Sequence, residues 1–405
     1  MSTGAEAAAA TGVPDDSVLE RIRANISAGN LGSWPVAIGL VLIVLFFSFK
    51  ADNFFTAPNF TNIITQMAGV TMLAYGVVFV LLIGEIDLSI SYVAGVGGVV
   101  VAQMTIVASS QEVPGWLAIM IAVGACAAIG AFQGSIVALI GVPAFVVTLA
   151  GYQIWQGVIQ KSIPQGVIVI QNNTVNDVAN YFFSKRAGWI IAIVIAGLYL
   201  AGTIGGILQR RRHGIAVRDP WLLAFRTGAV VLATFLVVWI CNKDRGVPFV
   251  LLLIIGFLIF WTYIAKRTTF GRHVYAVGGN AEGARRAGIN VARVRIIVFM
   301  ISSGMAGVGG IVLAARLNSV DLNAGGGTLL IDAIAAAVIG GCSLFGGRGE
   351  VRDALFGSLV IATIANGLNT LNLTQGVIYI ITGCILLFAV TLDTVLRSRQ
   401  KKAGR

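Results

Sequence analysis

Long apolar segments alternate with short polar ones along almost the whole chain. A helix needs about 20 apolar residues to cross a bilayer, and twelve segments approach that length. They lie at about 34–49, 63–83, 89–110, 116–140, 144–160, 188–208, 222–241, 248–265, 295–315, 329–345, 354–371 and 376–396. No segment shows the alternation of apolar and polar residues, over about ten residues, that membrane β-barrels require. The pattern predicts an all-α polytopic membrane protein.

The third and tenth segments are the least regular of this set. Each begins beside an acidic residue, Asp87 or Asp332, and carboxylates are costly at membrane depth. We expect about 10–12 transmembrane helices rather than one fixed count, with some of the segments broken or re-entrant.

Composition supports the same class. Hydrophobic residues make up 57% of the 405 residues and charged residues only 11%, whereas soluble proteins carry about 25% charged residues. The 50 glycines suit helices that pack closely in lipid. The four cysteines lie in or beside apolar segments without a C-x-x-C pair, and the two histidines lie in separate loops. No metal site is therefore expected.

The distribution of charge sets the expected orientation. A net charge of +11 would suggest nucleic acid as a partner of a soluble protein. Here most of the 28 Lys and Arg residues fall in alternate loops, as the positive-inside rule requires, so no nucleic acid is expected. Both termini are predicted to be cytoplasmic. The predicted organisation is a tail at 1–33, a transmembrane domain at 34–396 and a second tail at 397–405.

Three polar side chains near the third segment are candidates for a translocation pathway. Glu85, Asp87 and Ser89 lie in GEIDLSIS, between two apolar segments. An ionisable residue at membrane depth is a functional hypothesis by default. The alternative for Asp87 is a local one, because a carboxylate is stabilised at the start of a helix by the helix dipole. Glu85 lacks that explanation, which favours a pathway or conformational role.

Further pathway candidates follow towards the carboxyl end. Asp332 opens the tenth segment on the predicted outer side, and its IleAsp pair repeats that of the third segment, which is weak support for an internal repeat. Asn366 and Asn369 share one helical face with Asn372. Such a stripe either joins helices or lines a hydrated route. Neutral amides would suit a sugar or another uncharged polyol.

The sequence lacks the motifs of an ATPase or another enzyme. No Lys directly follows a Gly, so the G-x-x-x-x-G-K-[ST] loop for ATP phosphates is missing. The glycine cluster GMAGVGG at 304–310 falls within an apolar segment and predicts a helix-packing surface. We expect no catalytic residues and no cofactor, with any ATP used by a partner subunit.

The longest polar run of the carboxyl-terminal half is a predicted cytoplasmic loop at 266–295. Gly278-Gly279-Asn280 indicates a turn, and short helices are expected on both sides of it. Two uses are open from the residues alone. The loop is either a basic linker on anionic lipid or a docking element for a soluble partner.

The residues of this loop resemble a known family. FGRHVYAVGGNAEGARRAGINV is similar to the coupling loop in permease subunits of ribose, arabinose and xylose ABC importers. GEIDLS, VPAFVVTLAGYQIWQGV at 142–158 and LIDAIAAAVIGGCSLFGGRG at 330–349 resemble further motifs of these permeases. The acidic residue in EIDLS and an insertion at 185–265, which adds a pair of spans, are typical of the xylose-type branch. Tyr92 and Leu330 depart from the family pattern.

The resemblance implies a subunit of an importer for D-xylose or a similar pentose in the bacterial inner membrane. It implies a homodimer of permease chains, bound to cytoplasmic ATPase subunits and to a periplasmic sugar-binding protein. A β-branched residue at Gly279 is then expected to uncouple transport. The residues expected to couple to the ATPase are Gly271, Arg272, Tyr275, Gly278, Gly279, Asn280, Glu282, Arg285 and Gly288.

Other functions remain open at this point. Within the same class, the substrate could be another sugar, a polyol or a nucleoside. A secondary transporter driven by H⁺ or Na⁺ would use Glu85, Asp87 and Asp332, and would need no ATPase. A passive channel is a third alternative. Co-purification with an ATPase and a binding protein would separate these classes.

Overall fold

The computed structural model describes residues 34–106, 113–214 and 220–385, together with 387 and 391. The predicted tails at 1–33 and 397–405 lie outside these residues. The helices are α2 (Trp34–Lys50), α3 (Ala57–Leu82), α4 (Ile90–Met104), α5 (Gly115–Ser135), the π-helical η1 (Ile136–Ile140), α6 (Ala144–Ser162), α7 (Asn173–Asn180), α8 (Lys185–Arg212), α9 (Pro220–Lys243), α10 (Phe249–Arg267), α11 (Thr269–Gly279), α12 (Ala281–Arg286), α13 (Val291–Leu317), α14 (Leu329–Gly340) and α15 (Val351–Thr370). A further apolar helix spans Gln375–Ile385.

Each of the twelve apolar segments corresponds to one of these helices, so the predicted helical class is confirmed. Within the described residues, seven helices are long and apolar enough to cross a membrane by themselves. The third and tenth segments form α4, with 15 residues, and α14, with only 12. Both are shorter than the about 20 residues of a complete span. The two segments that begin beside an aspartate are thus among the four that form short apolar helices within the described residues.

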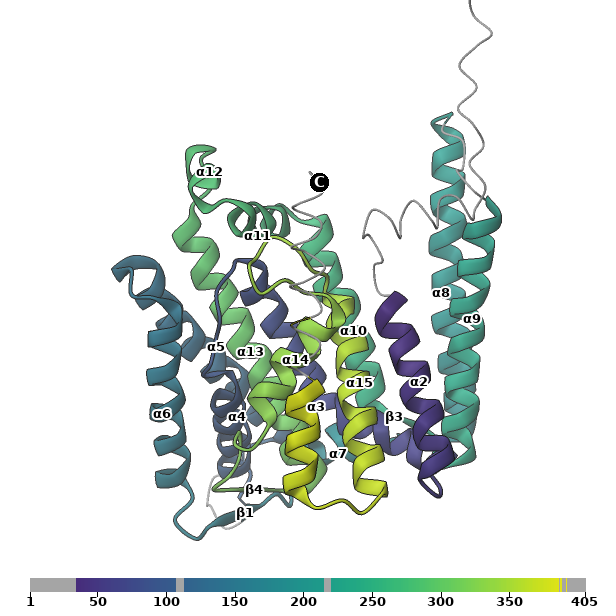
Figure 1. Ribbon diagram of the computed structural model, residues 1–405, viewed down its shortest axis with the longest axis horizontal. Coiled ribbons are helices and arrows are strands. Elements are labelled where there is room, and N and C mark those ends of the chain that lie inside the picture. Colours follow the sequence, from purple (N-terminus) through teal and green to yellow (C-terminus); the bar gives the residue numbers. More distant parts are fainter. Residues whose placement is uncertain (1–33, 107–112, 215–219, 386, 388–390, 392–405) are drawn as a thin grey trace, which may run out of the picture.

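The strands are short and join loops at the end of the bundle opposite α11 and α12 (Figure 1). β1 (Val167–Val169) pairs antiparallel with β4 (Ser319–Asp321), and Ile168 lies opposite Val320. β2 (Phe182–Phe183) pairs antiparallel with β3 (Val247–Pro248). These pairs fix the connections on this side.

Helix α13 occupies the centre of the bundle and packs on α3, α4 and α5 (Figure 1). Its glycine cluster forms the packing surface that the sequence predicts. A side chain at Gly310 would overlap the carbonyl oxygen of Ala94 in α4, and one at Gly307 would approach the Cys126 sulfur in α5 to 2.8 Å. Small residues let helix backbones approach closely where lipid offers no hydrophobic driving force.

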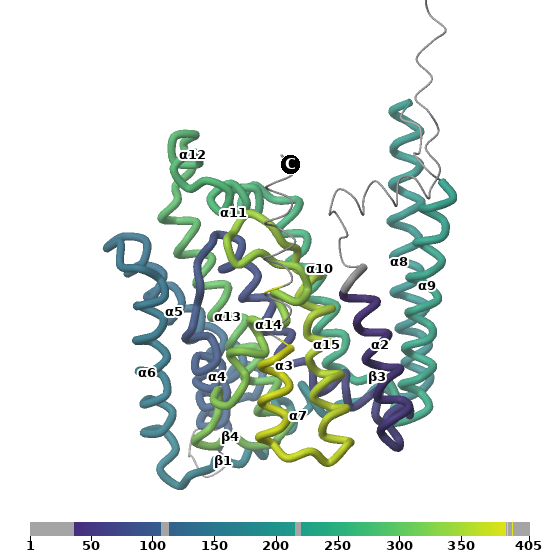
Figure 2. Tube along the Cα trace, in the orientation of Figure 1, coloured from purple at the N-terminus to yellow at the C-terminus, as the bar shows by residue number. Residues whose placement is uncertain are grey.

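Helices α8 and α9 pack on each other and stand at one side of the bundle, as both views show (Figures 1 and 2). In the most apolar part of each of these two helices, only 11% of the residues are buried, whereas the corresponding share for α13 is 67%. Helix α10, the third helix of the predicted insertion, instead packs on α3, α11 and α15. The range 185–265 therefore contains one peripheral hairpin and one helix of the main body.

Candidate functional site

The loop at 266–295, predicted to be cytoplasmic, folds as two short helices at a corner. Helix α10 ends at Arg267, and the Thr268 side chain caps α11 by accepting a hydrogen bond from the Gly271 amide at 3.2 Å. Asn280 ends α11 and caps α12, because its Oδ1 accepts from the Gly283 amide at 2.8 Å. Asn and Thr are favoured at such positions because their side chains satisfy amides of the first turn. The predicted pair of helices about a turn is confirmed.

Three of the predicted coupling residues pack against the helix bundle. Gly271 packs against the last carbonyl groups of α10, and Gly278 packs against the carbonyl oxygen of Leu82 at the end of α3. Tyr275 donates a hydrogen bond from its hydroxyl to the carbonyl oxygen of Gly349 at 2.8 Å. Burial raises the pKa of Tyr275 to about 12, so this hydroxyl stays protonated at neutral pH. These three residues seat α11 on the bundle.

The other predicted coupling residues are exposed on α11, α12 and the turn that follows. A side chain added at Gly279 would meet nothing within 4 Å, so close packing requires glycine at Gly278 rather than at Gly279. Gly288 has a φ of +84°, which glycine adopts without strain. The exposed set is Arg272, Gly279, Asn280, Glu282, Arg285 and Gly288.

The surface on which α11 packs includes the loop between α14 and α15. The Gly347 amide donates to the Leu82 carbonyl at 2.9 Å, which joins this loop to α3. Lys266 at the end of α10 lies 2.7 Å from Glu350, the residue that caps α15. The loop therefore contacts α3, α10 and α11 and continues directly into α15.

The carboxylate of Asp87 is buried between α4 and α13. Its Oδ1 accepts from the Ser89 amide at 3.0 Å and from the Ser89 hydroxyl at 2.7 Å, while Oδ2 accepts from the Ser302 hydroxyl at 3.2 Å. Ser89 also lies 2.9 Å from Oε1 of Gln133 in α5. A buried carboxylate persists only where donors compensate for lost water. Asp87 thus binds Ser89, the residue that precedes α4, and also joins this point to α13.

Glu85 pairs with Arg295 in the first turns of α13, with 3.0 Å between Oε1 and Nη2. Their side chains are 19% and 30% exposed. The residue whose charge had no local explanation in the sequence therefore has a partner 210 positions along the chain. Together with Asp87, it connects the irregular segment between α3 and α4 to α13.

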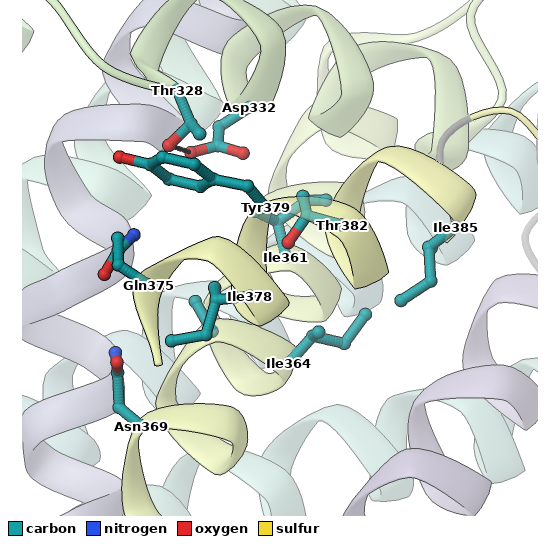
Figure 3. Close-up of a pocket in the computed structure, with 11 residues that line it drawn as sticks. Thr328, Asp332, Ile361, Ile364, Asn369, Gln375, Ile378, Tyr379, Thr382 and Ile385 are labelled. Carbon is teal, nitrogen blue, oxygen red and sulfur yellow. Dashed lines mark hydrogen bonds between the residues drawn. The ribbon is translucent and has the colours of Figure 1, made fainter. Parts of the chain in front are cut away.

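A cavity of about 90 Å³ lies between α14, α15 and the helix Gln375–Ile385. Asp332 lies at its wall and accepts a hydrogen bond from the Thr328 hydroxyl at 2.7 Å. Figure 3 shows the Tyr379 ring beside these two residues, with Asn369 and Gln375 along the same side. The lining residues are Thr328, Asp332, Ile361, Ile364, Ala365, Asn369, Gln375, Ile378, Tyr379, Thr382 and Ile385.

The three asparagines of the predicted stripe have different surroundings. Asn372 does not share the helical face, because α15 ends at Thr370 and Asn372 has a φ of +54°. Asn366 is buried, and its Nδ2 lies 3.4 Å from Oε1 of Gln66 in α3. Asn369 lines the cavity. One stripe on α15 therefore contributes both to helix packing and to a polar wall, the two uses that the spacing left open.

Comparison with known proteins gives a consistent result. The model of a family described as "Branched-chain amino acid transport system / permease component" matches residues 59–390. The xylose transport system permease protein XylH of Escherichia coli K12 is 33% identical over 373 residues, which cover 91% of this chain and 93% of that protein. The chain belongs to this permease family.

Other relatives of the permease agree. XylH of Haemophilus influenzae is 33% identical over 379 residues, which cover 92% of the permease and 98% of that protein. The ribose import permease protein RbsC of Escherichia coli K12 is 32% identical over 359 residues, which cover 88% of the permease and 92% of that protein. The resemblance carried by the loop motifs is confirmed. No solved structure matches the permease. It is a multi-pass membrane component of a transport system.

Several residues of these sites are absent from the predicted set. Thr328 lies four residues before Asp332, and Gln375 lies four before Tyr379. Both spacings place the pair on one helical face, and this was the signal available in the sequence. Nothing local indicated that Arg295, Gln133 or Ser302 would meet the segment at 85–89. Those contacts depend on how α5 and α13 pack.

Proposed function

We propose that this permease is the membrane-spanning subunit of an ATP-driven importer for D-xylose or a similar pentose. The observation that carries the proposal is the identity of 33% to permeases named for xylose transport, over more than nine-tenths of both chains. The missing phosphate loop supports a division of labour in which ATP is bound and hydrolysed on another chain.

The cytoplasmic ATPase is proposed to bind the exposed side of α11 and α12. This side carries Arg272, Asn280, Glu282 and Arg285, and it projects from the bundle (Figure 1). A periplasmic sugar-binding protein is proposed to dock at the opposite end, where β1 and β4 lie. In this arrangement both termini are cytoplasmic, and the bacterial inner membrane surrounds the bundle.

Coupling is proposed to pass through the inward side of α11. Gly278 contacts the end of α3, and Tyr275 holds the loop that leads into α15. A displacement of α11 would act on both contacts at once, because Tyr275 and Gly278 lie on this same short helix. The loop joins α14 and α15, so movement of the ATPase would reach the walls of the cavity.

The pathway candidates are proposed to have two roles. Asp332 and Asn369 line the cavity and are placed to meet a solute. Glu85, Asp87, Ser89 and Asn366 are engaged with other helices, which supports a structural role next to the pathway. A second permease chain is proposed to cover the outer face of α14, α15 and the helix Gln375–Ile385, where Ile331, Tyr379 and Ile380 are exposed.

Reconstitution in liposomes tests the proposal. The permease, its ATPase and its binding protein are combined, and uptake of D-xylose is measured with and without ATP on the cytoplasmic side. We expect uptake only with ATP and all three components. Uptake by the permease alone under a proton or sodium gradient would show a secondary transporter instead. Ribose and leucine serve as competing solutes that test the substrate class.

A further inference from the structure

The cavity between α14, α15 and the helix Gln375–Ile385 has two chemically different sides. Hydroxyl, amide and carboxylate groups come from Thr328, Asp332, Asn369, Gln375 and Tyr379, which gather along one side (Figure 3). Four isoleucines form most of the rest of the wall, together with Ala365 and Thr382. About 10–15 Å³ suffices to hold one water molecule, so a volume of about 90 Å³ admits several waters or part of a small solute.

The polar side chains lie on helices that cross or enter the membrane. A carboxylate and exposed amides are unfavourable in contact with lipid, and they are retained at that depth where they face a hydrated route. Asp332 receives its one side-chain hydrogen bond, within the described residues, from Thr328 in the preceding turn. Its acceptor capacity is therefore incompletely used, unlike that of Asp87, which accepts from the side chains of two helical regions.

The set of polar groups distinguishes between classes of solute. A carboxylate accepts hydrogen bonds from hydroxyl groups, amide side chains both donate and accept, and the Tyr379 ring offers a flat apolar surface. A sugar presents hydroxyl groups at its rim and C–H groups on its faces. An amino acid would bring its own carboxylate, and none of the described lining residues is a cation that could pair with it.

We propose that this cavity is a contact site for a neutral, polyhydroxylated solute during translocation, with Asp332 accepting from hydroxyl groups of the solute and Asn369 and Gln375 completing the polar side. The site rests on the proposed importer function. It assigns to the permease itself a preference for neutral polyols, in addition to any selection by a binding protein.

The test compares three variants in the reconstituted complex with ATPase and binding protein. Asp332→Asn keeps the shape of the side chain but removes the charge. Gln375→Leu changes a second polar group on the same side of the cavity, at an exposed position. Thr370→Val is the matched control, because the Thr370 hydroxyl donates to the Asn366 carbonyl in its own helix and lies outside the cavity. Maximal D-xylose uptake and ATP hydrolysis stimulated by the binding protein are both measured.

We expect Asp332→Asn to lower maximal uptake about tenfold, the change that loss of a hydrogen bond to a charged group produces. Gln375→Leu should lower it about threefold, as for a neutral hydrogen bond. ATP hydrolysis should remain at the wild-type rate in both variants, and Thr370→Val should leave uptake and hydrolysis unchanged. Half-saturation should not move, since the binding protein captures the sugar first.

Each other outcome is decisive. If both cavity variants import D-xylose at the wild-type rate, the cavity is not a solute site, although the importer function stands. If uptake and ATP hydrolysis fall together, Asp332 has a structural role and the proposal is wrong. If the wild-type complex imports leucine and not D-xylose, the proposed function is wrong and the assignment to neutral polyols is wrong with it.

Discussion

Two aspartates of this permease follow an isoleucine at the start of a short helix, yet their surroundings differ. Asp87 precedes α4, is only 4% exposed, and accepts hydrogen bonds from Ser89 and from Ser302 of α13. Asp332 lies in the first turn of α14, accepts from Thr328 four residues earlier, and faces a cavity. The same dipeptide can therefore join helices or remain available to a solute. The packing around the carboxylate decides between these roles.

Two neighbouring glycines at the end of α11 show the same contrast. Gly278 lies against the end of α3, and a side chain there would come within 2.8 Å of the Gly347 amide nitrogen. Gly279 has open space around its α-carbon. One position is committed to contacts within the chain, and the next is free for a partner. Adjacent residues of one motif thus separate into an inner and an outer role.

The largest expected effect comes from removing the buried carboxylate. Asp87→Ala leaves the Ser89 amide and the Ser302 hydroxyl without their acceptor, whereas the Ser89 hydroxyl keeps Oε1 of Gln133. A buried polar group left unpaired costs about 1–3 kcal/mol, so we expect a loss of several kcal/mol in stability and a much lower yield of folded permease. Thermal unfolding in detergent measures the change. Asp332→Ala is the control and should shift the midpoint little. Equal losses at both positions would contradict the distinction between them.

The next effect concerns the two glycines. Gly278→Ala should lower ATP-dependent uptake more than tenfold, because the added methyl group displaces α11 from the end of α3. Gly279→Ala should fold normally, since alanine is favoured over glycine in helices by about 0.5–1 kcal/mol. Uptake and ATP hydrolysis in the reconstituted complex are the measurements. If Gly279→Ala abolishes uptake and Gly278→Ala does not, contact with the partner matters more than the seat of α11.

These contrasts show which parts of the molecule local sequence could predict. The apolar segments, the irregular third and tenth helices and the two helices about Asn280 all follow from patterns within about 20 residues. The partners of Asp87 and Glu85 do not, because Ser302 and Arg295 lie more than 200 positions away. The cavity also escaped prediction, since three helices supply its walls. Gly278 and Gly279 are the same residue type, and their different roles follow from the position of α3, which contacts only Gly278.

A smaller effect on stability is expected for an ion pair that is neither fully buried, like Asp87, nor fully exposed. Glu85 and Arg295 are in contact but partly exposed, and such pairs contribute about 0.2–1 kcal/mol. A double-mutant cycle with Glu85→Gln and Arg295→Gln should give a coupling free energy of about 1 kcal/mol or less in thermal unfolding. A coupling above about 3 kcal/mol would instead place Glu85 with Asp87 among the fully buried polar contacts.

The smallest effect on the isolated permease is expected at the exposed ion pair of α12. Glu282 lies 3.3 Å from Arg285, and both side chains are more than half exposed. Surface substitutions of this kind change stability by about 0.5 kcal/mol or less, so Arg285→Ala should leave thermal unfolding unchanged. Binding of the ATPase should nevertheless weaken about tenfold, because exposed Arg residues often dominate interfaces. Co-purification and titration with the ATPase measure this. Unchanged binding would mean that the docking surface lies elsewhere than on the outer side of α12.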